Sequence, residues 1–91
     1  MGGQQILLIM TPAQSRAARA LRELTQTQLA VAAGLGLSTV VDFERSRRAV
    51  SDEAVAAMRA SLESAGVVFV DENGEGPGVR LRKRPNQGDD R

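Results

Sequence analysis

Apolar residues recur every three or four positions from residue 12 to residue 66, the spacing that gathers them on one side of a helix. Capping residues and glycines divide this stretch into four predicted helices. The first should cover residues 12–24, because Thr11 is a suitable N-cap and Pro12 suits the first helical turn. Its expected buried face consists of Ala17, Ala20, Leu21 and Leu24.

The second predicted helix begins after Thr25, which forms the capping-box spacing with Gln28. We expect Gly34 to end this helix, because glycine readily adopts a positive φ. A short connection then leads to a third helix over residues 37–45. The predicted packing face of the second helix consists of Leu29, Ala30, Ala32 and Ala33. That of the third helix consists of Val40 and Phe43, with Val41 partly buried.

Ser51 precedes a fourth predicted helix, with Asp52 and Glu53 in the first turn, where negative charge is favourable. Gly66 should end it. Its expected core positions are Ala54, Val55, Met58, Ser61 or Leu62, and Ala65.

Beyond Gly66 the apolar period changes to two. The runs "VVFV" (67–70) and "GVRLR" (78–82) are typical of strands, and "DENGEGPG" between them is rich in turn residues. This pattern predicts a β-hairpin within residues 67–84. An isolated hairpin is marginally stable, and open strand edges invite pairing, so the hairpin is a candidate dimerisation element.

The two ends of the chain are less defined. For residues 1–10 two interpretations stay open: "ILLIM" (6–10) forms a short strand that extends the sheet, or it belongs to a mobile arm before Met10. Residues 85–91 contain no apolar side chain, and we expect this tail to be disordered.

The amino-acid composition limits the kinds of functional site that the protein can contain. The 91 residues suit one small domain, and the absence of cysteine and histidine excludes disulfides, thiolate or imidazole metal sites and nucleophile–histidine catalysis. We therefore expect a binding protein rather than an enzyme, with no metal and no cofactor. The run "ILLIM" is far shorter than the roughly 20 residues that span a bilayer, so we expect no membrane span and a cytoplasmic protein.

Charge is unevenly distributed along the chain, although its net value is only +1. Residues 16–48 carry six arginines against three acids, residues 51–75 carry six acids against Arg59, and residues 80–84 are basic again. Local fields attract phosphate even where the total charge is near zero. Ordinary solvated faces are the alternative explanation.

The segment "ALRELTQTQLAVAAGLGLSTVVDFERSRR" (20–48) resembles the helix-turn-helix of phage repressor and Cro proteins, the XRE type of bacterial regulator. The family motif is matched by Leu24-Thr25-Gln26, Leu29-Ala30, Gly34, Ser38-Thr39 and Phe43-Glu44-Arg45. The end "AGVVFVDENGEGPGVRL" (65–81) is also similar to that of small repressor-like regulators. The resemblance implies a mainly α, lambda repressor-like bundle of four helices over residues 11–66, followed by the hairpin.

The same resemblance implies a sequence-specific transcriptional regulator, a homodimeric repressor whose partner is double-stranded DNA. It assigns base reading to the third helix, phosphate contacts to the second helix and to the residues after the third, and an internal ion pair to Arg19 and Glu44. The base-reading positions are Gly36, Leu37, Ser38, Thr39 and Asp42, and the phosphate positions are Thr25, Gln26, Arg45, Arg47 and Arg48.

The reading positions lack the glutamine or arginine that recognises adenine or guanine. Leu37 can contact a thymine methyl, Ser38 and Thr39 can donate or accept hydrogen bonds, and Asp42 can accept from a cytosine amine. For Asp42 a second interpretation stays open, in which it points to solvent or pairs with Arg45 or Arg47. We expect modest direct specificity, supplemented by DNA shape and dimer spacing.

One alternative function uses the same fold as a protein-interaction module, of antitoxin or anti-activator type. The hairpin and the acidic fourth helix would then bind a protein partner. Asp42 and Glu53 favour this alternative, as does the lack of strong base readers.

Overall fold

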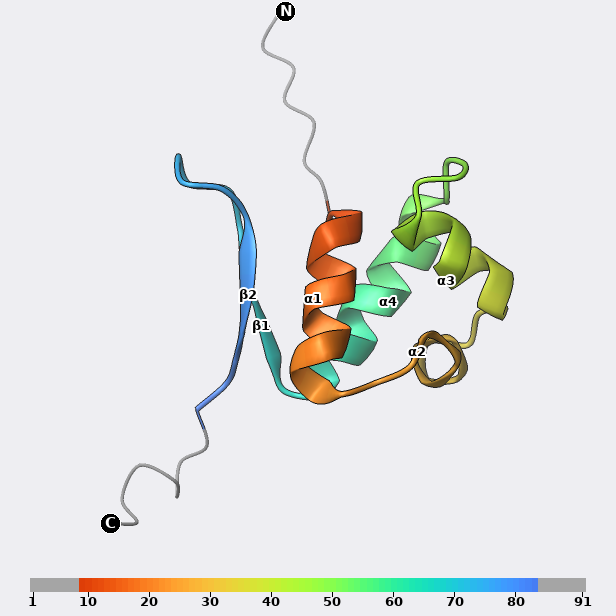
Figure 1. The fold of residues 1–91 in the computed structure, drawn as a ribbon, viewed down its shortest axis with the longest axis horizontal. Coiled ribbons are helices and arrows are strands. Elements are labelled where there is room, and N and C mark those ends of the chain that lie inside the picture. The colour runs from red at the N-terminus through yellow and green to blue at the C-terminus, as the bar shows by residue number, and fades with distance from the viewer. Residues whose placement is uncertain (1–8, 84–91) are drawn as a thin grey trace, which may run out of the picture.

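The computed structural model describes residues 9–83 and contains four helices followed by a hairpin. The elements are α1 (Pro12–Arg22), α2 (Gln26–Ala33), α3 (Leu37–Glu44), α4 (Asp52–Ser64), β1 (Val67–Val70) and β2 (Gly78–Leu81). The hairpin lies on one side of α1, whereas α2 and α3 lie on the opposite side (Figure 1). Helix α4 lies behind α1 in this view. The predicted mainly α fold with a C-terminal hairpin is confirmed.

The predicted helix caps are also confirmed. The Thr25 hydroxyl accepts from the Gln28 backbone N–H at 3.0 Å, and the Gln28 side chain accepts from the Thr25 N–H at 2.8 Å. Gly34 ends α2 with φ 71°. The structure adds a cap at Ser51, whose hydroxyl accepts from the Ala54 N–H at the start of α4. Each of these bonds joins residues three or four apart, so the local sequence suffices to specify it.

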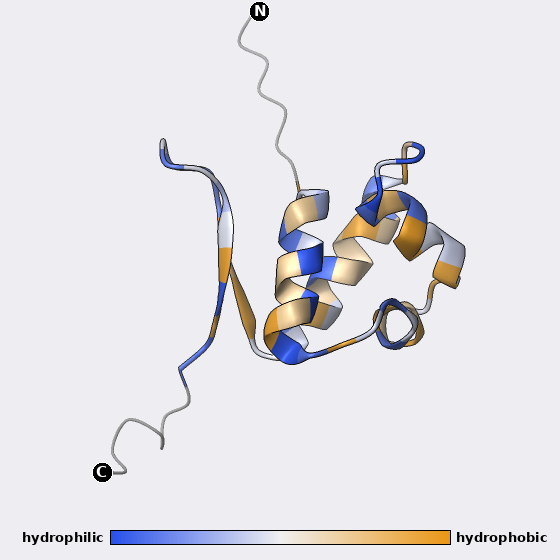
Figure 2. Ribbon diagram, in the orientation of Figure 1, coloured by the Kyte–Doolittle hydropathy of each residue, from blue (hydrophilic) through white to orange (hydrophobic). Residues whose placement is uncertain are grey.

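The prediction for α1 is wrong in its end and in its buried face. The helix stops at Arg22 because Glu23 adopts the left-handed conformation, with φ 56°. Ala17, Ala20 and Leu21 are exposed, and the buried residues are Gln14, Ser15 and Ala18. Two of these three are polar, and Figure 2 shows hydrophilic and apolar segments mixed along α1. A search for apolar periodicity cannot find a face whose buried groups are satisfied by hydrogen bonds.

The core is formed by α4, β1 and the facing sides of the other helices. Its buried residues are Met10, Ala18, Leu29, Ala30, Val40, Val55, Met58, Leu62, Val67 and Phe69. Two smaller corrections concern α2 and α3: Ala32 is exposed, and α3 ends at Glu44 rather than at Arg45. The helices are short, so few positions on each face the core.

The hairpin pairs its two strands antiparallel, with Val67 opposite Leu81 and Phe69 opposite Val79. Val67 and Phe69 are buried and Val79 is half-buried, whereas Leu81 remains 42% exposed. β1 therefore carries most of the packing against the helices, and the end of β2 presents an apolar side chain to solvent.

Residues 9 and 10 adopt no strand conformation and lie against the core. Arg59 of α4 donates from Nη1 to the Ile9 carbonyl at 2.6 Å, and its guanidinium carbon lies 4.7 Å from the centre of the Phe69 ring. Arg59 thereby links Ile9 to α4 and β1. The possible strand over residues 6–8 and the predicted disordered tail 85–91 lie outside the described residues.

Gln14 connects α1 to the hairpin. Its side-chain oxygen accepts from the Thr11 N–H at 2.9 Å and completes a capping box at the start of α1. Its side-chain amide donates to the carbonyl of Gly78 at 3.0 Å and to that of Val70 at 3.3 Å. One buried side chain thus caps a helix and holds the adjacent ends of both strands.

Glutamate at position 14 should separate these two roles. Gln14→Glu keeps the oxygen that serves the capping box but places a carboxylate beside two carbonyl oxygens. We expect it to lower the free energy of unfolding by about 2 kcal/mol at pH 7, measured by urea denaturation. Gln28→Glu is the matched control, because Gln28 holds the same position in the α2 capping box and is exposed. Equal effects of the two substitutions would contradict a role of Gln14 in docking the hairpin.

Candidate nucleic-acid interface

The N-terminal end of α3 is uncovered. Gly36, Leu37 and Ser38 are exposed, with Leu37 at 46%, and Thr39 is half-buried. The other side of the helix is anchored, because Val40 lies in the core and Glu44 is 1% exposed. The N-terminal end of α3 therefore exposes polar and apolar side chains, while its buried side holds the helix in place.

Glu44 anchors α3 through a buried hydrogen-bond network. Its carboxylate accepts from Arg19 Nη2 at 2.7 Å and Nε at 2.9 Å, from Ser15 Oγ at 2.5 Å and from Gln26 Nε2 at 3.0 Å. The structure thus places Arg19 and Glu44 in an ion pair and adds two partners that the sequence did not indicate. Among the described residues every buried side-chain nitrogen and oxygen has a hydrogen-bond partner. The network joins α1, α2 and α3.

The environment of Glu44 has two opposing effects on its pKa. Burial favours the neutral acid and by itself would raise the pKa. The hydrogen bonds from Arg19, Ser15 and Gln26 and the positive charge of Arg19 favour the carboxylate more strongly. The pKa of Glu44 is therefore lowered from its ordinary value, and the group is charged at neutral pH.

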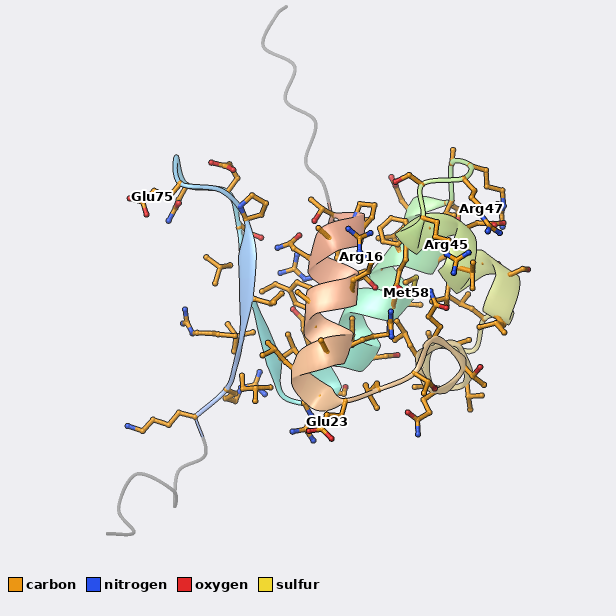
Figure 3. The ribbon with its side chains drawn as sticks, in the orientation of Figure 1. Arg16, Glu23, Arg45, Arg47, Met58 and Glu75 are labelled. Carbon is orange, nitrogen blue, oxygen red and sulfur yellow. The ribbon has the colours of Figure 1, made fainter. Side chains whose placement is uncertain are left out.

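Arg16 is a further contact between α1 and α3 that sequence reasoning missed. Its Nη1 donates to the backbone carbonyl of Glu44, at the C-terminal end of α3, where positive charge is favourable. Arg16 lies one helical turn before Arg19, and that spacing was the available signal. In Figure 3, Arg16 lies on the side of the molecule that carries Arg45 and Arg47, and Glu75 lies on the opposite side.

Asp42 pairs with two arginines of the loop that follows α3. Its Oδ2 lies 2.8 Å from Arg48 Nε, and its Oδ1 lies 3.8 Å from Arg47 Nη1. The sequence left open that Asp42 pairs with an arginine, either Arg45 or Arg47. The partners in the structure are Arg48 and, more distantly, Arg47. Ser46 adopts a left-handed conformation, with φ 54°, and the Arg47 N–H donates to the Asp42 carbonyl at 2.8 Å, so the chain after α3 lies close to Asp42.

The family model named helix-turn-helix matches residues 16–63, just over half of the chain. The chain belongs to this family, in the phage-repressor type called XRE. This helix-turn-helix protein is accordingly a DNA-binding regulator. No curated protein matched the sequence. Within residues 9–83, none of the helices has the length and apolar character needed to cross a bilayer.

In this helix-turn-helix protein α2 and α3 are the two motif helices, and Gly34 to Gly36 connect them. Thr25 and Gln26 lie at the N-terminus of α2, but their side chains are engaged within the protein, by Gln28 and Glu44 respectively. The three arginines of the α3–α4 loop are exposed. The structure thus brings the sequence-predicted phosphate residues to the two ends of the motif.

Proposed function

We propose that the protein is a dimeric repressor that inserts the N-terminal half of α3 into the major groove. The observation that carries this proposal is the exposure of Gly36, Leu37 and Ser38 on a helix whose opposite face is fixed. Base reading requires side chains that reach out from a rigid support, because misplaced donors and acceptors lose discrimination.

Direct reading is assigned to four residues. Leu37 would contact a thymine methyl, Ser38 and Thr39 would exchange hydrogen bonds with base edges, and Gly36 would allow close approach of the backbone. The carboxylate of Asp42 is held by Arg48 and is considered separately below.

Phosphate contacts would come from both ends of the motif. Arg45, Arg47 and Arg48 supply charge after α3, and arginine suits phosphate because its donors form a rigid fork. Since the side chains of Thr25 and Gln26 are engaged, the α2 N-terminus would bind phosphate through backbone N–H groups.

Dimerisation is assigned to the hairpin. Its two strands pair only with each other in the described residues, so each has an open edge, and Leu81 adds an exposed apolar side chain. A two-fold dimer would place its α3 helices about one DNA turn apart. Repression follows from occupancy of promoter DNA and requires no further activity.

Selection of bound duplexes from a random DNA pool tests the proposal. We expect enrichment of an inverted repeat whose half-sites are centred about 10 base pairs apart. Sedimentation or size-exclusion measurements on the same sample check that the protein is dimeric. Failure to enrich any sequence at low salt with a dimeric sample would overturn the proposal.

Leu37 offers a direct test of base reading. Leu37→Ala should weaken binding to the selected site about five- to tenfold, because one apolar base contact is lost, and should leave Tm nearly unchanged since Leu37 is exposed. Replacing each thymine in turn with uracil removes its methyl group. The wild type should lose affinity at one position at which Leu37→Ala is insensitive. Equal sensitivity of both proteins at every position would exclude a contact between Leu37 and a thymine methyl.

A protein-interaction function is the second candidate, and one observation favours it. Val31 on α2 is 76% exposed and Leu37 on α3 is 46% exposed, so both motif helices offer an apolar side chain that a protein partner would cover. Reversing the charges of Arg45, Arg47 and Arg48 distinguishes the two functions. Biological activity that survives this change would favour protein binding over DNA binding.

A further inference from the structure

The acid within α3 is held by two arginines. Asp42 Oδ2 accepts from Arg48 Nε at 2.8 Å, and Asp42 Oδ1 lies 3.8 Å from Arg47 Nη1. Arg48 also donates from Nη1 to the Ala49 carbonyl at 3.3 Å, which further restrains its guanidinium. Each carboxylate oxygen therefore faces a positive charge from the same protein.

Exposure is unequal within this cluster. The Asp42 side chain is 20% exposed, whereas those of Arg47 and Arg48 are 55% and 51% exposed. The arginines can reach an incoming phosphate, but they must exchange the carboxylate for it. A free carboxylate at this position would repel DNA, and the ion pairs reduce that repulsion. The same ion pairs make Arg47 and Arg48 less available to phosphate.

We propose that Asp42 is a positioning residue that restrains Arg47 and Arg48 and thereby weakens binding to DNA of arbitrary sequence. This inference rests on the proposed DNA-reading function. On a poorly fitting sequence the arginines stay paired with Asp42. On the operator, closer docking of α3 brings phosphates near enough to replace the carboxylate.

Such a restraint suits the sparse reading face of α3. Specificity is the difference between the free energies of binding to the operator and to other sequences. A helix with few strong base contacts gains discrimination when phosphate binding is weakened more on other sequences than on the operator. Because the arginines exchange Asp42 for phosphate only on the operator, Asp42 has this selective effect without contacting a base.

The test measures binding to a short duplex of unrelated sequence over a range of salt concentrations. Asp42→Asn removes the charge and keeps the shape. We expect the slope of log affinity against log salt to steepen by about one to two, because one or two phosphate contacts are gained. Affinity at 0.1 M salt should rise about five- to tenfold.

Glu75→Gln is the matched control. It removes one negative charge from the exposed hairpin loop, on the side of the molecule away from the arginines (Figure 3). We expect its salt slope and affinity to equal those of the wild type. An equal rise in both variants would show that net charge alone is responsible and would overturn the proposal.

A cycle with the two arginines tests whether Asp42 acts through them. In an Arg47→Gln/Arg48→Gln background, Asp42→Asn should no longer change the slope. A change that persists there would assign a direct action on DNA to the carboxylate. Weaker binding by Asp42→Asn would overturn the proposal and would show that Asp42 instead preorganises the arginines for DNA. Loss of discrimination at a single C·G pair would also overturn it and would assign base reading to Asp42.

Two further measurements keep the outcomes distinct. Asp42→Ser replaces Asp42→Asn if circular dichroism shows that the asparagine variant does not fold. Wild-type protein is first tested at low salt: absence of any duplex binding contradicts the proposed function itself. Wild-type binding with an unchanged slope in Asp42→Asn contradicts only the role of Asp42.

Discussion

Replacing Glu44 with glutamine should destabilise the protein by about 3 kcal/mol at pH 7, as measured by urea denaturation. Glu44 is 1% exposed, and its carboxylate accepts hydrogen bonds from Arg19, Ser15 and Gln26, which lie on two other helices. In glutamine an NH2 group replaces one of the two carboxylate oxygens, so it would face the hydrogen-bond donors of these residues. The charge of Arg19 would also lose its partner. Arg19 keeps 19% of its side-chain surface exposed, so the loss should lie at the lower end of the range for broken buried pairs.

The effect of this substitution should depend on pH. The pKa of Glu44 is lowered in the folded protein, so the stability gained from its charge is fully present above the unfolded-state pKa of about 4.3 and is lost as pH falls through the lower folded-state value. The stability difference between wild type and Glu44→Gln should therefore be largest at neutral pH and shrink below about pH 4. A difference that stays constant down to pH 3 would contradict this account of the network.

A double-mutant cycle isolates the ion pair. Arg19→Gln and Glu44→Gln should each be strongly destabilising, and the double variant should be less so than their sum, with a coupling of about 2 kcal/mol. Arg22→Gln is the control on the same helix, because Arg22 is exposed, and it should change stability by less than about 0.5 kcal/mol. Additive effects of Arg19 and Glu44 would mean that the two side chains stabilise the fold independently.

Removing the three arginines after α3 should abolish tight binding to the selected operator. Arg45→Gln/Arg47→Gln/Arg48→Gln should reduce affinity about 100- to 1000-fold at 0.1 M salt and lower the salt slope by about two to three, because in the proposed complex each arginine would contact about one phosphate. Stability should change little, since all three side chains are exposed. Fluorescence anisotropy over a salt series measures both quantities.

The matched control removes three positive charges from the other side of the molecule. Arg80→Gln/Arg82→Gln/Lys83→Gln alters exposed residues in and after β2, which α1 separates from α3 (Figure 1). We expect a decrease of less than about tenfold, from the weaker long-range field alone. If both triple variants bind equally well, the arginines do not form a localised phosphate contact, and the protein-interaction function gains support.

Local signals in the sequence predicted the elements and the motif. Thr25 with Gln28 and Ser51 with Ala54 form caps within four residues, Gly34 supplies the positive φ that ends α2, and the alternating runs after Gly66 become the hairpin. These outcomes depend on bonds between near neighbours, so the sequence specifies them without knowledge of the fold. The family model matches residues 16–63, which contain three of these four signals.

The family resemblance implied the Arg19–Glu44 ion pair, but the tertiary structure decided which other distant polar groups meet. Gln14 and Gly78 are 64 positions apart, and Ser15 and Glu44 are 29 apart, so no local pattern links them. The buried face of α1 was predicted wrongly for this reason: its polar side chains are satisfied by partners that packing brings from α3 and the hairpin. Asp42 is a similar case, because two interpretations fit its sequence, and the path of the chain after α3 brings Arg48 to it. The sequence by itself determined the helices, the turn and the family, whereas most long-range hydrogen bonds exist because packing brings distant polar groups together, where the buried ones must find partners.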